Sequence, residues 1–384
     1  MPRHAAVHVD LDAVAANVRE LAAFARPASL CAVVKADGYG HGAVPVARAA
    51  LAAGADLLAV ALVEEGVALR SAGIDAPVLV LSEPPADAMT DAVAAGLTPT
   101  LYTVAGVDAA AAAGGAAGWV VQLKVDTGMH RVGCAPEDAV LLARRSLDAG
   151  LVLGGTFTHL AVADEPDRPE TARQLERYRG VLADLASAGI DPGVRHAANS
   201  AGLLHHPEAR FDVVRVGIAV YGVRPTPEVA SPVDLRPAMS VRAEVSMLKA
   251  VAAGEGVSYG LRHTFARDAL VATVPVGYAD GVARALGTSG GEVLIGGVRR
   301  PVRGVVTMDQ FVVEVTDGPP VAVGEEVVLV GRQGDEEITA EDWGRRLGTI
   351  AYEVVCGFGP RLPRRYAGAA SVPAGVPDVD GELP

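Results

Sequence analysis

The sequence is poor in cysteine, in aromatic residues and in positive charge. Its three cysteines, Cys31, Cys134 and Cys356, stand far apart and in no metal-ligand spacing, so we expect reduced thiols, a cytoplasmic protein and no metal site. Aromatic residues make up only 4% of the chain, and alanine does much of the filling in their place. The 33 basic residues are outnumbered by 46 acidic ones, and the net charge of -13 argues against a nucleic-acid partner, because phosphate binding needs a basic face.

Signatures of several other protein classes are also absent from the sequence. The residues after Met1 lack the apolar core of a signal peptide, and no apolar run approaches the length of a membrane span, so we expect no membrane partner. The sequence contains no Walker A pattern and no H-E-x-x-H, and no G-x-G-x-x-G follows a predicted strand. The adjacent pair His205 and His206 is a weak hint of a metal, and solvated loop histidines explain it better.

Residues 1–230 alternate between strand-like and alanine-rich helix-like segments. After a lead-in strand near residues 5–11 and a helix capped by Asp10 or Asp12, we predict eight strands, at residues 30–35, 56–62, 77–81, 97–102, 119–125, 152–159, 194–199 and 213–218. Repeated βα units in this number and length predict a (β/α)₈ barrel of the TIM type. An open doubly wound sheet would also explain the alternation, but it usually has fewer strands.

The chain changes character after Tyr221. A proline-rich segment at residues 223–237 predicts a linker, and valine-rich runs separated by glycine turns follow it. Residues 231–366 are therefore predicted to form an all-β domain, with one helix near residues 341–347 that starts at Thr339 with Asp342 three residues later. Residues 367–384 are rich in Gly, Pro and Ala and acidic, and we predict a disordered tail.

Polar and ionisable residues stand at the carboxyl ends of the predicted barrel strands, where barrels of this type have their active sites. They include Lys35, Lys124, His159, His196 and Arg215. A lysine at the end of one buried strand could simply reach out to solvent. So many polar groups at one end of otherwise apolar strands favour a ligand site.

Lys124 illustrates the chemistry of this end of the barrel. In the strand at residues 119–125, Val121, Leu123 and Val125 share the face toward the covering helices, so Lys124 points inward, within reach of Arg131. Two like charges ~4 Å apart cost on the order of 4 kcal/mol at an effective dielectric constant of ~20. Either the lysine points to water or something neutralises it, and carbamylation by carbon dioxide would convert it into an anion.

Six motifs resemble those of the alanine racemase family, in family order. Residues 32–42, AVVKADGYGHG, are similar to the family's pyridoxal-phosphate lysine motif. The other five are KVDTGMHR at residues 124–131, HAANS at 196–200, VSYG at 257–260, VGYADG at 276–281 and MDQ at 308–310. The resemblance extends from about residue 5 to residue 364. It implies a homodimeric, pyridoxal-phosphate-dependent enzyme that racemises alanine and supplies D-alanine for peptidoglycan.

The resemblance implies a role for each matching residue around the cofactor. Lys35 would form the Schiff base and act as the acid and base on one face of the substrate. The other residues implied in cofactor binding are Tyr39, His159, Asn199, Ser200, Arg215, Gly217 and Ile218. Of these, Tyr39, Ser200 and the amides of Gly217 and Ile218 would hold the phosphate, since hydroxyls and N–H groups suit an anion. Arg215, supported by His196 and linked to His159, would contact the pyridine nitrogen; because arginine only donates, that nitrogen would stay unprotonated.

The same resemblance implies a second set of residues around the substrate. Tyr259 would be the opposing base, supplied by the other subunit. Ionising an ordinary tyrosine of pKa ~10 at pH 7 costs roughly 4 kcal/mol, so its pKa must be lowered. Arg131 would bind the substrate carboxylate, and Tyr278 and Met308 of the other subunit would shape the pocket. Supporting residues would be Lys124 as a carbamate, His196, Asp309 and Arg284.

Two departures from the family pattern and three alternatives stay open at this stage. Pro360 stands where some members have a phosphate-contacting tyrosine, and His130 stands where Gly is frequent. A broad-specificity amino-acid racemase would share the motifs. A decarboxylase of the same fold would be expected to have an acid in place of Arg215 and a cysteine in place of Tyr259. A non-catalytic pyridoxal-phosphate carrier would lack the β domain.

Overall fold

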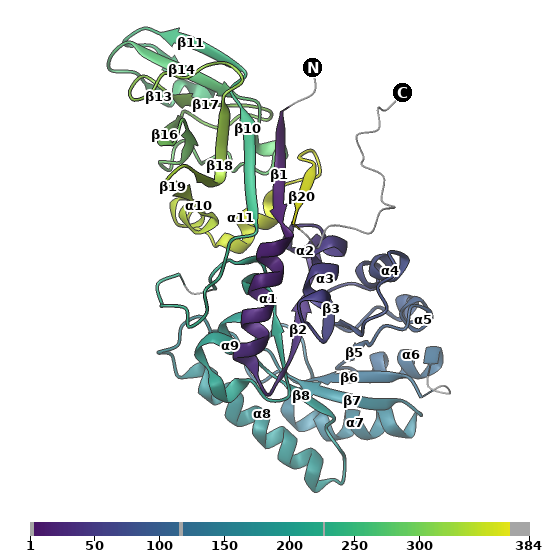
Figure 1. The fold of residues 1–384 in the computed structure, drawn as a ribbon. Helices are drawn as coiled ribbons and strands as arrows, with labels where there is room; N and C mark the ends of the chain where they lie inside the picture. The colour runs from purple at the N-terminus through teal and green to yellow at the C-terminus, as the bar shows by residue number, and fades with distance from the viewer. Residues whose placement is uncertain (1–3, 115–117, 226, 369–384) are drawn as a thin grey trace.

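Eight parallel strands form a closed barrel in the structure, a computed structural model that describes residues 4–114, 118–225 and 227–368 (Figure 1). The strands are β2 (Ser29–Val33), β3 (Leu57–Val60), β4 (Val78–Val80), β5 (Thr100–Leu101), β6 (Val120–Lys124), β7 (Val152–Phe157), β8 (Val194–His196) and β9 (Val213–Val216). They form two four-stranded sheets, β4-β3-β2-β9 and β5-β6-β7-β8. Backbone hydrogen bonds join them: Val80 N–H donates to Thr98 O at 2.9 Å, and Arg215 N–H donates to Ala198 O at 2.9 Å. The predicted barrel is confirmed.

Helices cover the outside of the barrel (Figure 1). They are α1 (Leu11–Ala25), α3 (Ala43–Ala52), α4 (Val63–Ser71), α5 (Met89–Ala94), α6 (Val104–Gly114), α7 (Ala139–Asp148), α8 (Glu170–Ser187) and α9 (Ser200–His205). The predicted sidedness of β6 is confirmed, since Val121, Leu123 and Val125 pack in one buried cluster with Leu142 of α7 and Leu185 of α8. The alternate residues of β6 therefore face the barrel interior.

The second half of the chain is built mainly of strands. They are β10 (Met239–Glu244), β11 (Met247–Val251), β12 (Gly256–Val257), β13 (His263–Thr264), β14 (Ala269–Val274), β15 (Glu292–Ile295), β16 (Val298–Arg303), β17 (Phe311–Glu314), β18 (Glu326–Gln333), β19 (Glu336–Ile338) and β20 (Arg364–Ala367). The helix α10 (Ala340–Leu347) begins as predicted, because Thr339 Oγ1 accepts from Asp342 N–H at 3.1 Å and Asp342 Oδ2 accepts from Thr339 N–H at 3.0 Å. A further helix, α11 (Ala351–Gly357), was not predicted.

The first strand, β1 (Ala5–Asp10), differs from the expected arrangement. It was assigned with the barrel, but it lies in the large sheet of the β domain, antiparallel to β10 and parallel to β20. Val7 and Val9 are fully buried there. Alternating apolar residues identify a strand but not its partner, because pairing is decided by distant segments. The predicted tail at residues 367–384 lies outside the described residues except for Ala367, which ends β20, and Gly368.

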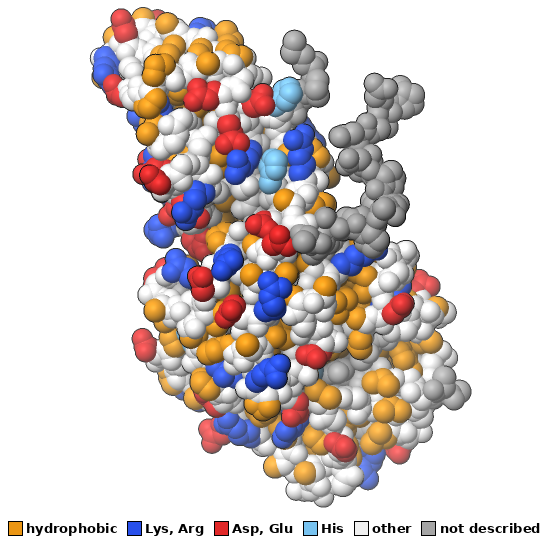
Figure 2. Space-filling model, in the orientation of Figure 1, with side chains coloured by type: hydrophobic (Ala, Val, Ile, Leu, Met, Phe, Trp, Pro, Cys, Tyr) orange, Lys and Arg blue, Asp and Glu red, His pale blue; other side chains and the backbone are white. Residues whose placement is uncertain are grey.

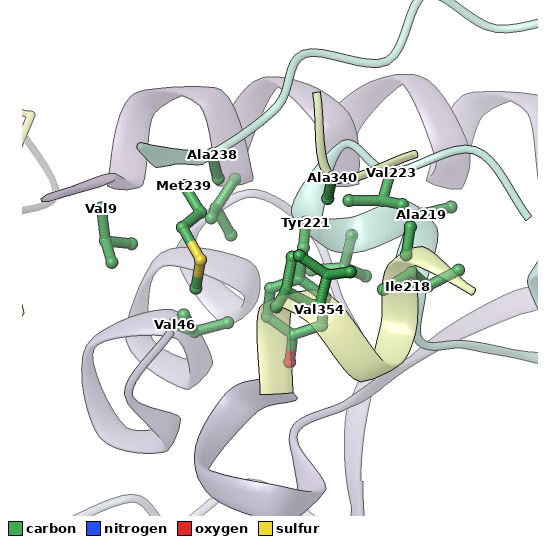
Figure 3. Packing of buried hydrophobic residues seen from close by; sticks show 14 of the residues in the cluster. Val9, Val46, Ile218, Ala219, Tyr221, Val223, Ala238, Met239, Ala340 and Val354 are labelled. Atoms are coloured by element: carbon green, nitrogen blue, oxygen red, sulfur yellow. The ribbon is translucent and has the colours of Figure 1, made fainter. Parts of the chain in front are cut away.

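One hydrophobic core runs through both halves of the molecule. Figure 3 shows Tyr221 of the barrel side packed with Met239, Ala340 and Val354 of the β domain. Because protein interiors are close-packed, this shared core fixes the β domain relative to the barrel mouth. On the face shown in Figure 2, acidic and basic side chains are interspersed among the described residues. In the part of the chain that the structure describes, no helix has the length and apolar character needed to cross a membrane.

Candidate active site

Lys35 begins a tight left-handed turn directly after β2. The turn occupies α2 (Lys35–Tyr39), and Ala36 and Asp37 have φ angles of 52° and 50°. A left-handed conformation costs residues other than glycine roughly 1–2 kcal/mol each, so the surrounding structure must hold the turn in place. Gly40 N–H donates to Ala36 O at 3.0 Å, and Ala43 N–H donates to Asp37 Oδ1 at 2.8 Å. The lysine is thereby presented at the barrel mouth.

Four cationic side chains converge at this mouth: Lys35, Lys124, Arg131 and Arg215. Burial, and then Arg131, lower the pKa of Lys35. Burial, followed by Arg215, Arg131 and Lys35, lowers the pKa of Lys124 to about 7. Lys124 Nζ donates to Leu81 O at 3.3 Å. Such a group of cations favours an anionic ligand, or a modification that makes one of them negative.

Arg215 is held by a chain of hydrogen bonds that fixes the protonation of its neighbours. Its Nη1 lies 2.8 Å from His196 Nδ1, and its Nη2 lies 2.8 Å from Thr158 O and 3.2 Å from His159 Nδ1. Because arginine only donates, both histidine Nδ1 atoms must accept. His196 then carries its proton on Nε2, which donates to Gln122 Oε1 at 2.7 Å. Burial, and then Arg215, lower the pKa of His196 well below its ordinary value, so the ring is neutral.

Gln122 was not predicted as a site residue. Its inward position next to Lys124 in β6 was the available signal, because it placed an amide inside the barrel. Burial lowers the pKa of Arg215 to about 10, and the side chain still carries its charge near neutral pH. The network therefore presents a charged, fixed donor to whatever ring lies against it.

Hydroxyl and amide donors gather next to Tyr39, where an anion would fit. Ser200 Oγ accepts from the N–H groups of Gly217 at 3.0 Å and Ala219 at 3.3 Å, and a hydroxyl that accepts twice still has its O–H to donate. A Cβ atom at Gly217 would collide with the Tyr39 hydroxyl and lie 3.0 Å from its Cζ. The cradle therefore requires glycine, and its neutral donors fit the phosphate of pyridoxal phosphate. Asn199 caps α9, because its Oδ1 accepts from Gly202 N–H at 2.8 Å. It thereby fixes the start of the helix, where Ser200 stands.

A second tyrosine stands beside this cradle and was missed by the sequence reasoning. The ring of Tyr352, from α11, lies with its centroid 6.3 Å from that of Tyr39. Burial raises the pKa of Tyr352, so its hydroxyl remains a neutral donor. The family pattern predicts this tyrosine just before Arg361, at the position of Pro360. The structure instead brings a tyrosine from eight residues earlier, because the unpredicted helix α11 packs against the turn after β2.

The loop that carries Arg131 is organised by Asp126. Its Oδ1 accepts from the N–H groups of Gly128 at 2.9 Å, Met129 at 3.0 Å and His130 at 3.1 Å. His130 has a φ angle of 56°, a left-handed conformation that glycine adopts at less cost, which explains why glycine suits this position. His130 therefore departs from the family pattern, and its N–H still takes part in the hydrogen bonding to Asp126.

The remaining predicted residues lie in the β domain, on one exposed surface. Tyr259, Tyr278 and Met308 expose 72%, 42% and 53% of their surface. Backbone hydrogen bonds hold their loops together: Tyr278 N–H donates to Thr307 O at 3.0 Å, and Val306 N–H donates to Arg284 O at 3.2 Å. Figure 1 shows β13, which follows the Tyr259 turn, at the far end of the β domain from α2. The structure thus separates Tyr259 from the Lys35 of the same chain.

Asp309 is bound within this surface by an arginine of the C-terminal segment. Arg361 Nη2 donates to Asp309 Oδ1 at 2.7 Å, and Arg361 Nε lies 3.1 Å from Oδ1 of the buried Asp280. Asp280 in turn accepts from Gly277 N–H at 2.8 Å, directly before Tyr278. The predicted residues Tyr278 and Asp309 are therefore positioned by one ion-pair network.

Comparison with known proteins gives a consistent result for the whole chain. The family model described as "Alanine racemase, N-terminal domain" matches residues 9–225, and that described as "Alanine racemase, C-terminal domain" matches residues 238–366. The gap between the two ranges falls within the proline-rich segment.

Individual relatives cover nearly the full length of the chain. An alanine racemase of Symbiobacterium thermophilum is 52% identical over 363 residues, which are 94% of this chain and 96% of that protein. The crystal structure of alanine racemase from D-cycloserine-producing Streptomyces lavendulae is similar with a TM-score of 0.90, 42% identity and coverage of 96% of this chain and 98% of that one. That of Bartonella henselae, with covalently bound pyridoxal phosphate, has a TM-score of 0.87, 28% identity and coverage of 95% and 100%.

Proposed function

The chain belongs to the alanine racemase family. From this premise we propose that it interconverts L-alanine and D-alanine with pyridoxal phosphate. The two opposed bases would be its own Lys35 and, on the other face of the substrate, Tyr259 of the partner subunit. When bound, this cofactor supplies an electron-withdrawing ring that acidifies the Cα–H bond of the amino acid joined to it. The observation that carries the proposal is the convergence, at one barrel mouth, of a lysine, a fixed arginine and a phosphate-shaped set of donors.

The chain's own residues would divide the work of holding the cofactor. Lys35 would hold it through its ε-amine. The phosphate would be held by Tyr39, Ser200 and the amides of Gly217 and Ile218, with Tyr352 as an additional hydroxyl donor, and the Gly217 N–H would exchange its present hydrogen bond to Ser200 Oγ for one to the phosphate. Arg215, which stays charged and only donates, would leave the ring nitrogen unprotonated. By leaving that nitrogen without a proton, Arg215 would limit the electron withdrawal that the cofactor supplies, which would favour simple proton exchange at Cα over transamination.

Lys35 is suited to exchange a proton on one face of the substrate. Burial and the neighbouring Arg131 lower the pKa of its amine, which brings the neutral, basic form closer to physiological pH. Arg131 would bind the substrate carboxylate from the rigid loop organised by Asp126. Lys124, converted to a carbamate, would neutralise the other cations and hold Arg131 in place.

A second copy of the chain would supply the opposite face. Tyr259 is 72% exposed and lies apart from the Lys35 of its own chain. The tyrosine that opposes Lys35 would therefore be supplied by a second chain. A homodimer that pairs the exposed surface of one β domain with the barrel mouth of its partner would bury Tyr259, Tyr278 and Met308 together. Asp309 and Arg284 would line the same small pocket, which suits a substrate with a methyl side chain.

The expected setting of this reaction is the cytoplasm, with D-alanine delivered to peptidoglycan synthesis. Three unpaired cysteines support a reducing compartment. Assays with alanine beside serine, lysine and arginine distinguish an alanine enzyme from a broad-specificity racemase.

The test combines cofactor binding with proton exchange. Wild type should show the visible absorbance of bound pyridoxal phosphate, Lys35→Ala should lose it, and Lys249→Ala, which removes an exposed lysine of β11, should keep it. Wild type should also exchange the Cα proton of L-alanine in deuterium oxide. A wild-type protein that binds the cofactor but leaves that proton in place contradicts the proposed function.

A further inference from the structure

Glu65 joins the lysine turn to the neighbouring loop of the barrel. It lies in the first turn of α4, after β3. Its Oε1 accepts from Ala36 N–H at 2.6 Å, and its Oε2 accepts from Ala61 N–H at 2.8 Å and Leu62 N–H at 3.1 Å. Both carboxylate oxygens are therefore committed to backbone donors, and one of those donors belongs to the residue directly after Lys35.

The hydrogen bond to Ala36 acts on the strained end of the turn. Ala36 has a left-handed backbone, with φ 52° and ψ 50°, and lacks the conformational freedom of glycine. The far end of the turn has its own restraints, since His41 Nδ1 lies 2.9 Å from Tyr39 O and Arg364 Nε donates to Gly40 O at 3.1 Å. At the near end, the Ala36 N–H is oriented toward Glu65. Removing this acceptor would leave the Ala36 N–H without its partner, while Ala36 O would still accept from Gly40 N–H at 3.0 Å.

Glu65 also changes the electrostatic surroundings of the Lys35 amine. The titratable groups that act on Lys35, or that it acts on, are Arg131 and Lys124 from β6 and its loop, His159 after β7, Cys356 of α11 and Glu65 of α4. Burial and Arg131 lower the pKa of Lys35, whereas Glu65 and Cys356 raise it. Among these residues, Glu65 has the carboxylate side chain. It therefore carries the negative charge that offsets the neighbouring cations.

We propose that Glu65 is a positioning residue for Lys35: its carboxylate restrains the left-handed turn that presents the lysine, and it adds a negative charge to the surroundings of the cationic barrel mouth. The consequence for cofactor binding rests on the proposed function, in which Lys35 holds pyridoxal phosphate. The effect of Glu65 on the protonation of the Lys35 amine does not rest on the proposed function, because it concerns the chain alone.

Glu65→Gln removes the negative charge and one of the two acceptor oxygens of the carboxylate, and two measurements follow the two effects. Glutamine keeps the length of the side chain but has one acceptor oxygen, so its NH₂ group must face a backbone N–H on one side. Glu64→Gln is the matched control, because Glu64 precedes it in the same helical turn and is exposed. The first measurement is the pH dependence of acetylation of Lys35 in the cofactor-free full-length chain, followed by peptide mass spectrometry with the exposed Lys249 as internal reference. The second is the dissociation constant for added pyridoxal phosphate.

In Glu65→Gln, the pH midpoint for Lys35 acetylation should move below that of wild type, and the dissociation constant should rise roughly tenfold or more, as for loss of a charged hydrogen bond. Glu64→Gln should leave both values unchanged. Equal Lys35 midpoints and equal dissociation constants in wild type and Glu65→Gln overturn the inference. If Glu65→Gln does not fold, Glu65→Asp decides: it keeps the charge but is one methylene too short to reach Ala36, and an unchanged dissociation constant overturns the positioning role. If wild type fails to bind the cofactor, the proposed function fails while the acetylation midpoint still tests this inference.

Discussion

Wild-type protein equilibrated with isotopically labelled bicarbonate is expected to carry a lysine carbamate on Lys124. Burial of the amine within the barrel, followed by the nearby charges of Arg215, Arg131 and Lys35, lowers the pKa of Lys124 to about 7. Only a neutral amine attacks carbon dioxide, and the product is an anion that the two neighbouring guanidinium groups would stabilise. The perturbation to compare with wild type is Lys124→Met, which keeps an unbranched side chain and removes the amine.

The pKa sets the size of the expected effect. With a pKa of about 7, half of the Lys124 side chains are neutral at pH 7. An ordinary lysine of pKa ~10.4 is neutral to about 0.04% at that pH, so the reactive form of Lys124 is enriched about a thousandfold. The carbamate should therefore appear as the pH rises through about 7, far below the range in which exposed lysines react.

The composition of the chain makes the assay clear. The sequence has three lysines, Lys35, Lys124 and Lys249, so the carbonyl region of a carbon NMR spectrum can contain few lysine carbamates. The signal should disappear in Lys124→Met and remain in Lys249→Met, which alters an exposed residue of β11. A signal that survives in Lys124→Met, or its absence from wild type in saturating bicarbonate at about pH 8, refutes the argument that burial and surrounding cations keep this amine neutral.

Three further results are expected. Gly217→Ala should weaken cofactor binding roughly a hundredfold, because the new Cβ would collide with the Tyr39 hydroxyl and displace it, whereas Gly180→Ala, whose Cβ would meet no atom within 4 Å beyond its neighbours and the backbone of its own helix, should leave titrations of the cofactor unchanged. Tyr259→Phe should block Cα proton exchange from one enantiomer of alanine far more than from the other, and equal losses in deuterium exchange would argue against two opposed bases. In buffer free of carbon dioxide, Lys124→Met should raise the free energy of unfolding at pH 7 by roughly 4 to 5 kcal/mol, since the folded-state pKa of about 7 lies below the unfolded value of about 10.4. This gain should be greatest below pH 7 and shrink to zero as the pH rises to about 10.4, and urea titrations that show a pH-independent difference would contradict it.

Local pattern was enough to predict the barrel and the strand-rich character of the second domain. Each predicted barrel run overlaps an observed strand, because period-two alternation and short apolar runs are properties of neighbouring residues. The same local information placed the start of α10 at Thr339, where side chain and backbone cap each other. It also identified Lys35, Lys124 and Arg215 as groups at one end of the barrel, since parallel strands bring their carboxyl ends to the same rim.

Contacts between distant segments decided the rest. β1 joins the sheet of the β domain, Tyr352 from α11 reaches the ring of Tyr39, and Gln122 holds His196 across two strands. Each of these pairings spans many residues, and nothing in the local pattern of either partner encodes the distance between them.

The sequence by itself determined that Lys35, Lys124 and Arg215 stand at one end of the barrel, and in what order they follow along the chain. Only the tertiary structure decided how these groups are held. Glu65 accepts a hydrogen bond from the residue after Lys35, and Arg215, which only donates, fixes the position of the proton on His196. Tyr259 lies exposed on the β domain, away from the Lys35 of the same chain. The physical reason is that strand periodicity specifies where a side chain points, whereas hydrogen bonds, pKa values and burial depend on what the folded chain brings to meet it.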